Sequence, residues 1–518
     1  MIDRRTVLGL FVGAACSVAF LWLTDIPLGI PGEWEWKRIP VEDGQMVAAG
    51  LGWVMAGSVA AVYCALAWLG VKRLEVCSRT ETAVWLGSLV LAGFFWLGVV
   101  QESPPAAKYR LTKTPWVLYD WGASGYFHEA RYKMHDVKSF LATYEAKMAE
   151  GDYYHVGTHP PGLFLLHRGL IRLCEQFPPL THVLLQLQPR SVEDGFEVLD
   201  STPRLHPPPL LKSDRAAIWL AAIVTQLVGV ATLIPLYLLL RRDYSPQISW
   251  MAVTFWPLVP ALAIFLPKSD ALYPFLGTAF LYVWLTGWRR RSALLCLFSG
   301  LLFWLGMFFS LAVLPYALLA ALMTVWEARL SVAAERPHDW FRATCVCVAW
   351  STAGLLVAGF ALWVAFDINL ANVWAWNGRN HAAFYDHHPR TYWKWLGVNA
   401  LELALAVGLP VLGLAASSFV RTLQPTRGWQ QRHLGPFWGC AIVWGLLWLS
   451  GKNMGEAARL WLVIQPWLIW LTAGSFQRPL SQRSTPHTSP PLKTWLLILV
   501  LQAIACLATV TRVSGFDY

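Results

Sequence analysis

The sequence predicts an all-α fold: a polytopic bundle of about thirteen transmembrane helices, with interfacial helices in one large extracytoplasmic loop. Three observations predict it. Of the 518 residues, 56% are hydrophobic and 14% are charged, whereas soluble domains carry about 25% charged residues. Apolar runs near 20 residues, the length that crosses a bilayer, recur along the chain. The 31 Trp residues fit the preference of indole rings for the membrane interface.

The apolar runs place the expected spans along the chain, with the run 293–326 divided at Ser310 because about 34 residues exceed one crossing. They fall at 6–23, 46–70, 82–100, 216–240, 247–266, 271–287, 293–309, 311–326, 343–366, 395–420, 435–450, 457–474 and 494–511. The chain therefore divides into four parts. These are three N-terminal helices (1–100), a large loop (101–215), a transmembrane core with an outer loop at 367–394 (216–474), and a cytoplasmic linker with the last helix (475–518).

Lys and Arg in the short loops orient the bundle. With Arg4 and Arg5 in the cytoplasm, most loop cations fall on the cytoplasmic side, including the run Arg289, Arg290 and Arg291. We therefore expect a multi-pass protein of the cell membrane, with loop 101–215 outside the cytoplasm. The formal charge of +10 does not indicate nucleic-acid binding, because the cations are dispersed between apolar runs. The nine cysteines show neither a disulfide framework nor metal-ligand spacing.

The loop 101–215 carries most of the polar chemistry. Apolar residues from Val137 to Met148 recur at helical spacing, and Gly151 is a natural stop for that helix. A second apolar stretch runs from Leu163 to Leu173. Both are typical of helices that lie in the membrane interface.

Short motifs in this loop follow a recognisable order. Asp136 opens the first helix, Gly151-Asp152 closes it, and Thr158-His159-Pro160-Pro161-Gly162 follows. In this order the sequence resembles the polyprenyl-phosphate-dependent glycosyltransferases of the GT-C superfamily, such as the bacterial lipid A aminoarabinose transferases and the protein O-mannosyltransferases. The segments 267–271 and 455–461 extend the resemblance more weakly. The chain departs from the family pattern in three ways: the loop follows the third span rather than the first, His159 stands where a Lys is usual, and no Lys lies near Ser310.

The resemblance implies an inverting transfer of a sugar from a polyprenyl-phosphate lipid donor to an envelope glycan, lipid or protein. Such a donor already has a good leaving group, so the enzyme needs a base for the acceptor and cations for the phosphate. We assign the base to Asp136, with Glu129 and Asp120 in reserve; Asp136 also suits a helix N-cap. The candidate substrate-binding residues lie on the outer side, where the alternative role is an interfacial anchor: His159, Lys268, Asp270, Arg379, Arg390, Lys394, Lys452 and Arg459.

The outer loop 367–394 is rich in aromatic residues, Asn and His. Such a loop suits a sugar site or an aromatic belt at the interface. His381, His387 and His388 with Asp386 could hold a divalent metal, although the expected chemistry needs no cofactor.

Two other classes of function remain open. A lipid or solute transporter, including a flippase, explains the many spans but not the long outer loop, and no inverted repeat is visible. A non-catalytic scaffold of the envelope would need no acidic residue at the membrane surface. The catalytic hypothesis predicts that Asp136, His159 and Arg459 surround one outward cavity.

Overall fold

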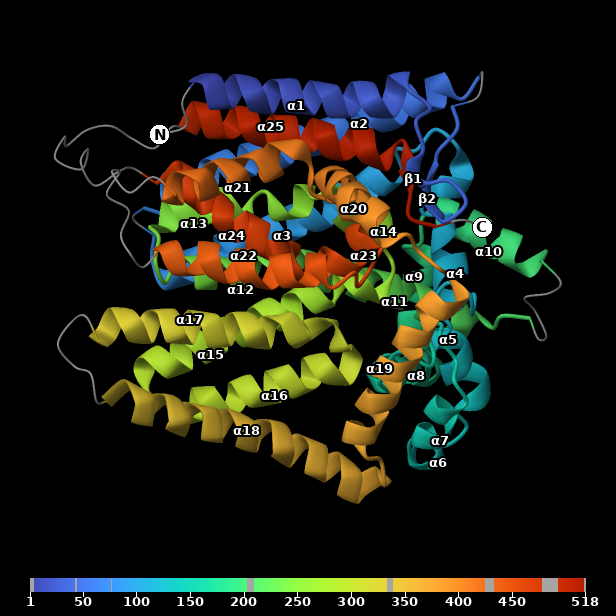
Figure 1. Ribbon diagram of the computed structural model, residues 1–518. Helices are drawn as coiled ribbons and strands as arrows, with labels where there is room; N and C mark the ends of the chain where they lie inside the picture. Colours follow the sequence, from blue (N-terminus) through green and yellow to red (C-terminus); the bar gives the residue numbers. More distant parts are fainter. Residues whose placement is uncertain are drawn as a thin grey trace.

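The computed structural model describes residues 4–41, 44–75, 77–202, 209–332, 339–423, 433–477 and 492–516. This part of the chain is almost entirely helical, which confirms the all-α prediction. The long helices lie roughly side by side in one bundle, with the N-terminus at one end and the C-terminus at the other (Figure 1).

Seven helices are long and apolar enough to cross a membrane, and they make this a multi-pass membrane protein. Three are N-terminal: α1 (Arg4–Leu23), α2 (Met46–Arg73) and α3 (Arg79–Gln101). The fourth joins α11 (Lys212–Ala231) to α12 (Leu233–Leu240). The others are Leu311–Leu330, which contains most of α17 (Leu314–Val332), then α18 (Asp339–Phe366) and α25 (Leu492–Val510).

Three further expected spans are interrupted, because proline removes a backbone donor and glycine permits a turn. Span 247–266 is divided into α13 (Pro246–Val253), the 3-10 helix η4 (Trp256–Leu258) and α14 (Pro260–Phe265). Span 395–420 bends by 111° between α20 (Tyr392–Val407) and α21 (Leu409–Thr422), where Gly408 has φ of +90°. Span 457–474 is divided into α23 (Ala457–Leu460), the 3-10 helix η9 (Trp461–Ile464) and α24 (Gln465–Phe476).

The remaining expected spans are continuous but shorter or less apolar. They are α15 (Tyr273–Arg290), α16 (Ala293–Phe309) and α22 (Leu434–Leu449). By length and composition the structure supports seven spans, or eight if the bent pair α20–α21 is one span. The count of thirteen remains a prediction. Most of the predicted linker 475–493 lies outside the described residues.

The large loop folds into short helices at one end of the bundle. The predicted helix 137–148 forms two pieces, α6 (Val137–Ala142) and α7 (Tyr144–Ala149), which bury Phe140, Leu141, Tyr144 and Met148. The second predicted helix lies within α8 (Gly162–Gln176). The other pieces are η1 (Ala107–Tyr109), α4 (Lys113–Tyr119), α5 (Tyr126–His128), the π-helix η2 (Glu129–Lys133), α9 (Pro178–Gln186) and α10 (Arg190–Asp200).

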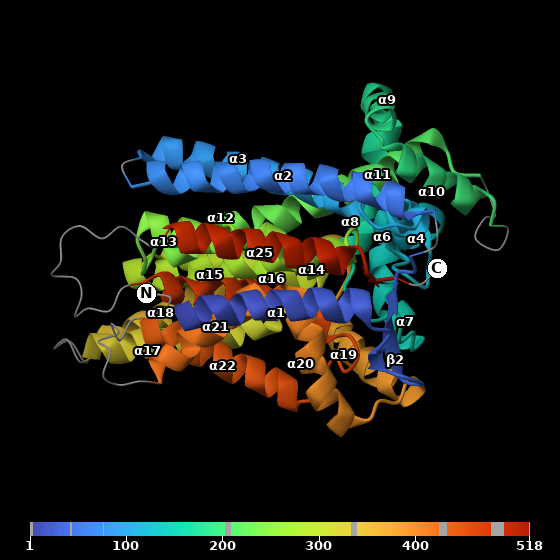
Figure 2. The ribbon, with the colours of Figure 1, turned by 90° about the horizontal axis from the view of Figure 1, so that it is seen from above.

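A small antiparallel sheet that the all-α prediction missed lies at the same end. Strands β1 (Leu28–Ile30), β2 (Trp34–Arg38) and β3 (Val513–Ser514) pair in that order, with Leu28 opposite Trp36 and Arg38 opposite Val513. Helix α19 (Leu370–His387), from the predicted outer loop, also lies there (Figures 1 and 2). One end of the bundle therefore collects the polar loops, opposite the N-terminus.

This arrangement predicts which positions share a side of the membrane. Single cysteines replacing the exposed Glu150 and Asp386 at the loop end should react with an impermeant thiol reagent in intact cells. A cysteine replacing the exposed Arg290, at the far end of α15, should react only after lysis. The measurement is labelling in a background from which the native cysteines have been removed. Labelling of position 290 with protection of positions 150 and 386 would invert the expected orientation.

Candidate active site

A cavity of about 520 Å³ lies where the bundle meets the polar end. Its apolar wall includes Leu311 from the 3-10 helix η6 (Leu311–Val313), Leu314 and Leu318 from α17, and Val443 and Leu446 from α22. Its polar wall comes from segments far apart in sequence: Thr158, His159, Asp270, Tyr273, Ser310, Asn377, His381, Lys452 and Asn453. The cavity thus has one apolar wall and one polar wall, as a site for an amphiphilic ligand requires.

Lys268 lies buried beside this cavity, in the turn before the 3-10 helix η5 (Ser269–Ala271). Its Nζ is 3.2 Å from Nε2 of His155, and the carbonyl oxygen of His155 is 3.0 Å from Nδ1 of His159. Burial lowers the pKa of both histidines, that of His159 to about 4, so neutral rings surround the ammonium group. Burial and the nearby Arg459 charge lower the pKa of Lys268 to about 7. Lys268 is therefore a buried cation whose charge an anionic ligand would stabilise.

Arg459 reaches the same region from the interrupted span 457–474. Its Nη2 donates to Oε2 of Glu456 at 3.1 Å, and its side chain is 12% exposed. Within the described part of the chain, its Nε has no hydrogen-bond partner. The guanidinium interacts electrostatically with Lys268 and Asp270. An unpaired donor on a buried cation is costly unless a ligand accepts from it.

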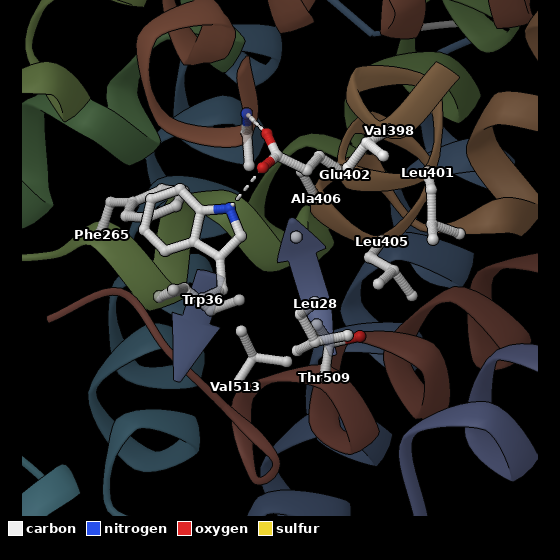
Figure 3. Close-up of a pocket in the computed structure, with 13 residues that line it drawn as sticks. Leu28, Trp36, Phe265, Val398, Leu401, Glu402, Leu405, Ala406, Thr509 and Val513 are labelled. Carbon is white, nitrogen blue, oxygen red and sulfur yellow. Dashed lines mark hydrogen bonds between the residues drawn. The ribbon is translucent and has the colours of Figure 1, made fainter. Parts of the chain in front are cut away.

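Two side chains of α20 bind the backbone of the short helix that carries Arg459 and of the turn before it. Oε2 of the buried Glu402 accepts from the backbone N–H of Ala458 at 3.4 Å, and its Oε1 accepts from Nε1 of Trp36 at 3.0 Å (Figure 3). One turn earlier, Oδ1 of Asn399 accepts from the N–H of Gly455 at 3.5 Å. The cavity beside Glu402 in Figure 3 holds only about 30 Å³, so it has room for little more than a water molecule. Glu402 thus positions the segment of Arg459 rather than lining a substrate site.

The three carboxylates first proposed as the base lie elsewhere. Asp136 is exposed and caps α6, accepting from the N–H of Ser139 at 2.7 Å. Glu129 is buried in ion pairs with Lys133 and Lys147; burial opposes its ionisation, but hydrogen bonds from these lysines lower its pKa overall. Asp120 closes the turn after α4 through the N–H of Ala123. Among the described residues that line the cavity, Asp270 is the one that carries a carboxylate.

The candidate phosphate binders also separate into two groups. His159, Asp270 and Lys452 line the cavity, and Lys268 and Arg459 adjoin it. Arg379 is exposed, with its guanidinium 4.9 Å from the ring centre of Trp376. Arg390 donates to the carbonyl of Glu33, and Nζ of Lys394 is 3.6 Å from the carboxylate of the same residue. Arg390 and Lys394 therefore fasten the β1–β2 hairpin to the start of α20.

The histidines of loop 367–394, which the sequence offered as possible metal ligands, differ in their surroundings. His381 lines the cavity, whereas His387 stacks on Tyr153 with ring centres 4.1 Å apart and His388 packs against Phe384. Within the ranges that the structure describes, no group of three or more His, Cys, Asp or Glu side chains could hold a metal ion. Asn377 and Asn380 of α19 both donate to the carbonyl of Gly157, which fixes α19 against the loop that carries His159.

Three residues of this region were not singled out from the sequence. His155 precedes His159 by four residues, a spacing that places both on one helical turn. Glu402 is an ionisable residue inside an expected span, which is by default a functional hypothesis. Tyr273 carries no such signal, because a tyrosine beside a proline at a helix start is ordinary.

The fold and the cavity together define a class: a multi-pass membrane protein whose buried charges surround a cavity at one end of its helix bundle. No family model matches the chain, and no curated protein matches it either.

The support from Glu402 can be tested through stability. Glu402→Leu should lower the free energy of unfolding by about 1–3 kcal/mol, because the donors of Trp36 and Ala458 lose their acceptors. Leu401→Ala is the matched control: Leu401 lines the same small cavity, is 43% exposed and leaves both hydrogen bonds intact. Its effect should stay within about 0.5 kcal/mol. Unfolding of the detergent-solubilised protein, followed by tryptophan fluorescence, measures both. Equal destabilisation by the two changes would contradict the role given to Glu402.

Proposed function

We propose that this chain is a GT-C-type glycosyltransferase, with about thirteen crossings, that transfers a sugar from a polyprenyl-phosphate carrier to a hydroxyl acceptor on the extracytoplasmic face. The observation that carries the proposal is the convergence of Lys268, Arg459 and Asp270 at one cavity. These residues come from segments nearly 200 positions apart, as their numbering shows. The resemblance of the loop 120–166 to the GT-C pattern supports the same class.

The proposed reaction is a single displacement. The acceptor oxygen forms a bond to the anomeric carbon of the sugar while the bond from that carbon to the phosphate oxygen breaks. The acceptor proton passes to a carboxylate, and polyprenyl phosphate leaves with the bonding electron pair. The phosphate gains one negative charge in this step, so Lys268 and Arg459 beside it would stabilise the transition state more than the ground state.

The cavity suits this donor in two respects. The leucines of α17 and the apolar residues of α22 offer a surface for an isoprenoid chain. The opposite wall supplies Asn377, His381 and Asn453, which have the hydrogen-bonding groups that a sugar needs. His159 and His155 are neutral, so they do not compete with the phosphate for Lys268 as anions would.

Two carboxylates compete for the role of base. Asp136 follows from the family resemblance, but its carboxylate is exposed and occupied as an N-cap. Asp270 lines the cavity and lies near the two cations. A general base must lie within hydrogen-bond reach of the proton it removes, so we favour Asp270.

The direct test is incubation of the purified protein with a panel of radiolabelled polyprenyl-phosphate sugars and an envelope extract as the source of acceptor. Release of polyprenyl phosphate with transfer of label supports the proposal. Translocation of a lipid across vesicles without any cleavage of the sugar–phosphate bond would support the transporter instead.

The base assignment predicts a difference between two Asp→Asn variants. Asp270→Asn should lower the transfer rate by about 10²–10⁴, because an amide cannot take the acceptor proton. Asp136→Asn should transfer at close to the wild-type rate, because Asn caps a helix as well as Asp does. Initial rates with saturating donor measure both. The reverse ranking would return the base to Asp136.

The pKa of Lys268, about 7, predicts a pH-dependent affinity for the donor. The anionic phosphate binds the protonated amine, so affinity should be full below pH 7 and fall as the pH rises above it. The sign follows because an anion favours the charged form of a lysine. Lys268→Arg should remove most of this dependence, since a guanidinium stays protonated throughout. Donor binding by scintillation proximity over this range is the measurement. An identical pH profile for both proteins would contradict a contact between Lys268 and the phosphate.

A further inference from the structure

A second cavity, of about 660 Å³, lies on another side of the bundle between α2, α3 and α11. It shares no lining residue with the candidate active site. Its volume falls within the range of pockets that hold small organic ligands, about 300–1,000 Å³. The proposed glycosyl transfer makes no use of it.

The long wall of this cavity is apolar and open to the surroundings of the bundle. Leu51 and Met55 of α2 and Phe95 of α3 line it, and each is more than 60% exposed. Helices α2 and α3 are both long enough to cross a bilayer. Their exposed apolar side chains would therefore face lipid, so a hydrocarbon chain could enter the cavity sideways from the membrane.

Two residues of opposite charge, Glu102 and Arg110, line one end of the cavity, and the buried Lys113, outside the lining, interacts electrostatically with Glu102. Glu102, at the end of α3, accepts from the hydroxyl of Ser191, and burial raises its pKa. Arg110 donates through Nε to the carbonyl of Pro104 at 2.9 Å and through Nη2 to that of Pro105 at 3.2 Å. A guanidinium has five N–H donors, so these two bonds leave three for a ligand. Arg110 and Lys113 offset part of the cost of burying this carboxylate, and an ammonium group in contact with it would offset more.

Two polar atoms on the cavity wall also lack partners. Thr114 is fully buried, yet its Oγ1 makes no hydrogen bond to any described residue. Nε1 of Trp219 is likewise buried and unpaired within the described ranges. Native proteins rarely leave buried donors unsatisfied. Both atoms could donate to the oxygens of a bound ligand.

We propose that this cavity binds a zwitterionic phospholipid with a primary ammonium headgroup. One acyl chain lies between α2 and α3, the phosphate meets Arg110, and the ammonium group meets Glu102. The ester and phosphate oxygens accept from Thr114 and Trp219. Within the lining, one anion and one cation match a zwitterion, because Lys113 lies outside the lining and donates to the carbonyl of Ile264. An anionic lipid would bring no cation for Glu102.

This site adjoins the candidate active site without depending on it. Leu266 and Pro267 line the phospholipid cavity, and Lys268 follows directly in the chain. A lipid seated there would brace the turn that carries Lys268. The proposal concerns lipid binding alone, so it stands or falls separately from glycosyl transfer.

The test is native mass spectrometry of the delipidated full-length protein, titrated with phosphatidylethanolamine, phosphatidylcholine or phosphatidylglycerol of identical acyl chains. We expect phosphatidylethanolamine to bind several-fold more tightly than the other two. Glu102→Gln, which keeps the size and an acceptor for Ser191, should reduce phosphatidylethanolamine binding to the level of phosphatidylcholine, whose quaternary ammonium donates no hydrogen bond.

Two glycine substitutions on α3 test whether an acyl chain occupies the apolar part of the cavity. A Cβ at Gly98 would lie 3.6 Å from Nε2 of Gln226, so a side chain fits there and fills the cavity that Gly98 lines. A Cβ at Gly87 meets nothing within 4 Å, and Gly87 does not line the cavity. Gly98→Leu should lower binding of all three lipids, and Gly87→Leu should leave it unchanged.

An unfolding midpoint equal to that of the wild type would establish that a variant is folded. If Gly98→Leu does not fold, the Glu102→Gln variant decides the test. Equal or tighter binding of phosphatidylglycerol, or undiminished phosphatidylethanolamine selectivity in Glu102→Gln, would overturn the proposal.

Discussion

Burying like charges side by side is the constraint on which the candidate active site depends. Lys268 lies close enough to Arg459 for the guanidinium charge to lower the pKa of the lysine, and both side chains are largely removed from water. Such a pair is stable only if anions compensate it. Glu456 and Asp270 supply part of that compensation. An anionic ligand, such as the phosphate of the proposed donor, would supply the rest.

Interrupted helices make this arrangement possible. In a continuous span every backbone N–H and C=O is paired within the helix. Where a helix breaks, the backbone groups at the break can bind other segments. The turn between the expected spans 247–266 and 271–287 carries Lys268 and Asp270, and the four-residue helix α23 of the interrupted span 457–474 carries Arg459. All three therefore lie in short segments between longer helices. Gln465, at the start of α24, donates to the carbonyl of Ala458 at 3.2 Å and so satisfies a group that the break exposes.

The hairpin and α20 hold these segments in place from outside. Glu33, between β1 and β2, accepts from the hydroxyl of Thr391 at 2.6 Å, from the N–H of Thr391 at 2.8 Å and from Nε1 of Trp395 at 2.8 Å. These hydrogen bonds, that of the Thr391 hydroxyl first, lower the pKa of Glu33 to about 2. Trp36 then reaches Glu402, and Glu402 reaches the helix of Arg459. The N-terminal and C-terminal parts of the chain meet here through β2 and β3. A continuous chain of contacts at the polar end of the bundle thus runs from the hairpin to Arg459.

The sequence by itself determined the helices and their apolar character, because a run near 20 apolar residues has few other stable states. It also identified Lys268, Asp270 and Arg459 as candidates, since polar residues at span ends are conspicuous, and His159 from the motif order of the large loop. It offered no way to choose between Asp136 and Asp270 as the proposed base, because an N-cap and a base use the same residue type. Nor could it foresee that Glu402 supports Arg459 or that His155 meets Lys268. Those pairings join positions 56 and 113 residues apart, and only the packing of interrupted helices decides which distant polar groups become neighbours.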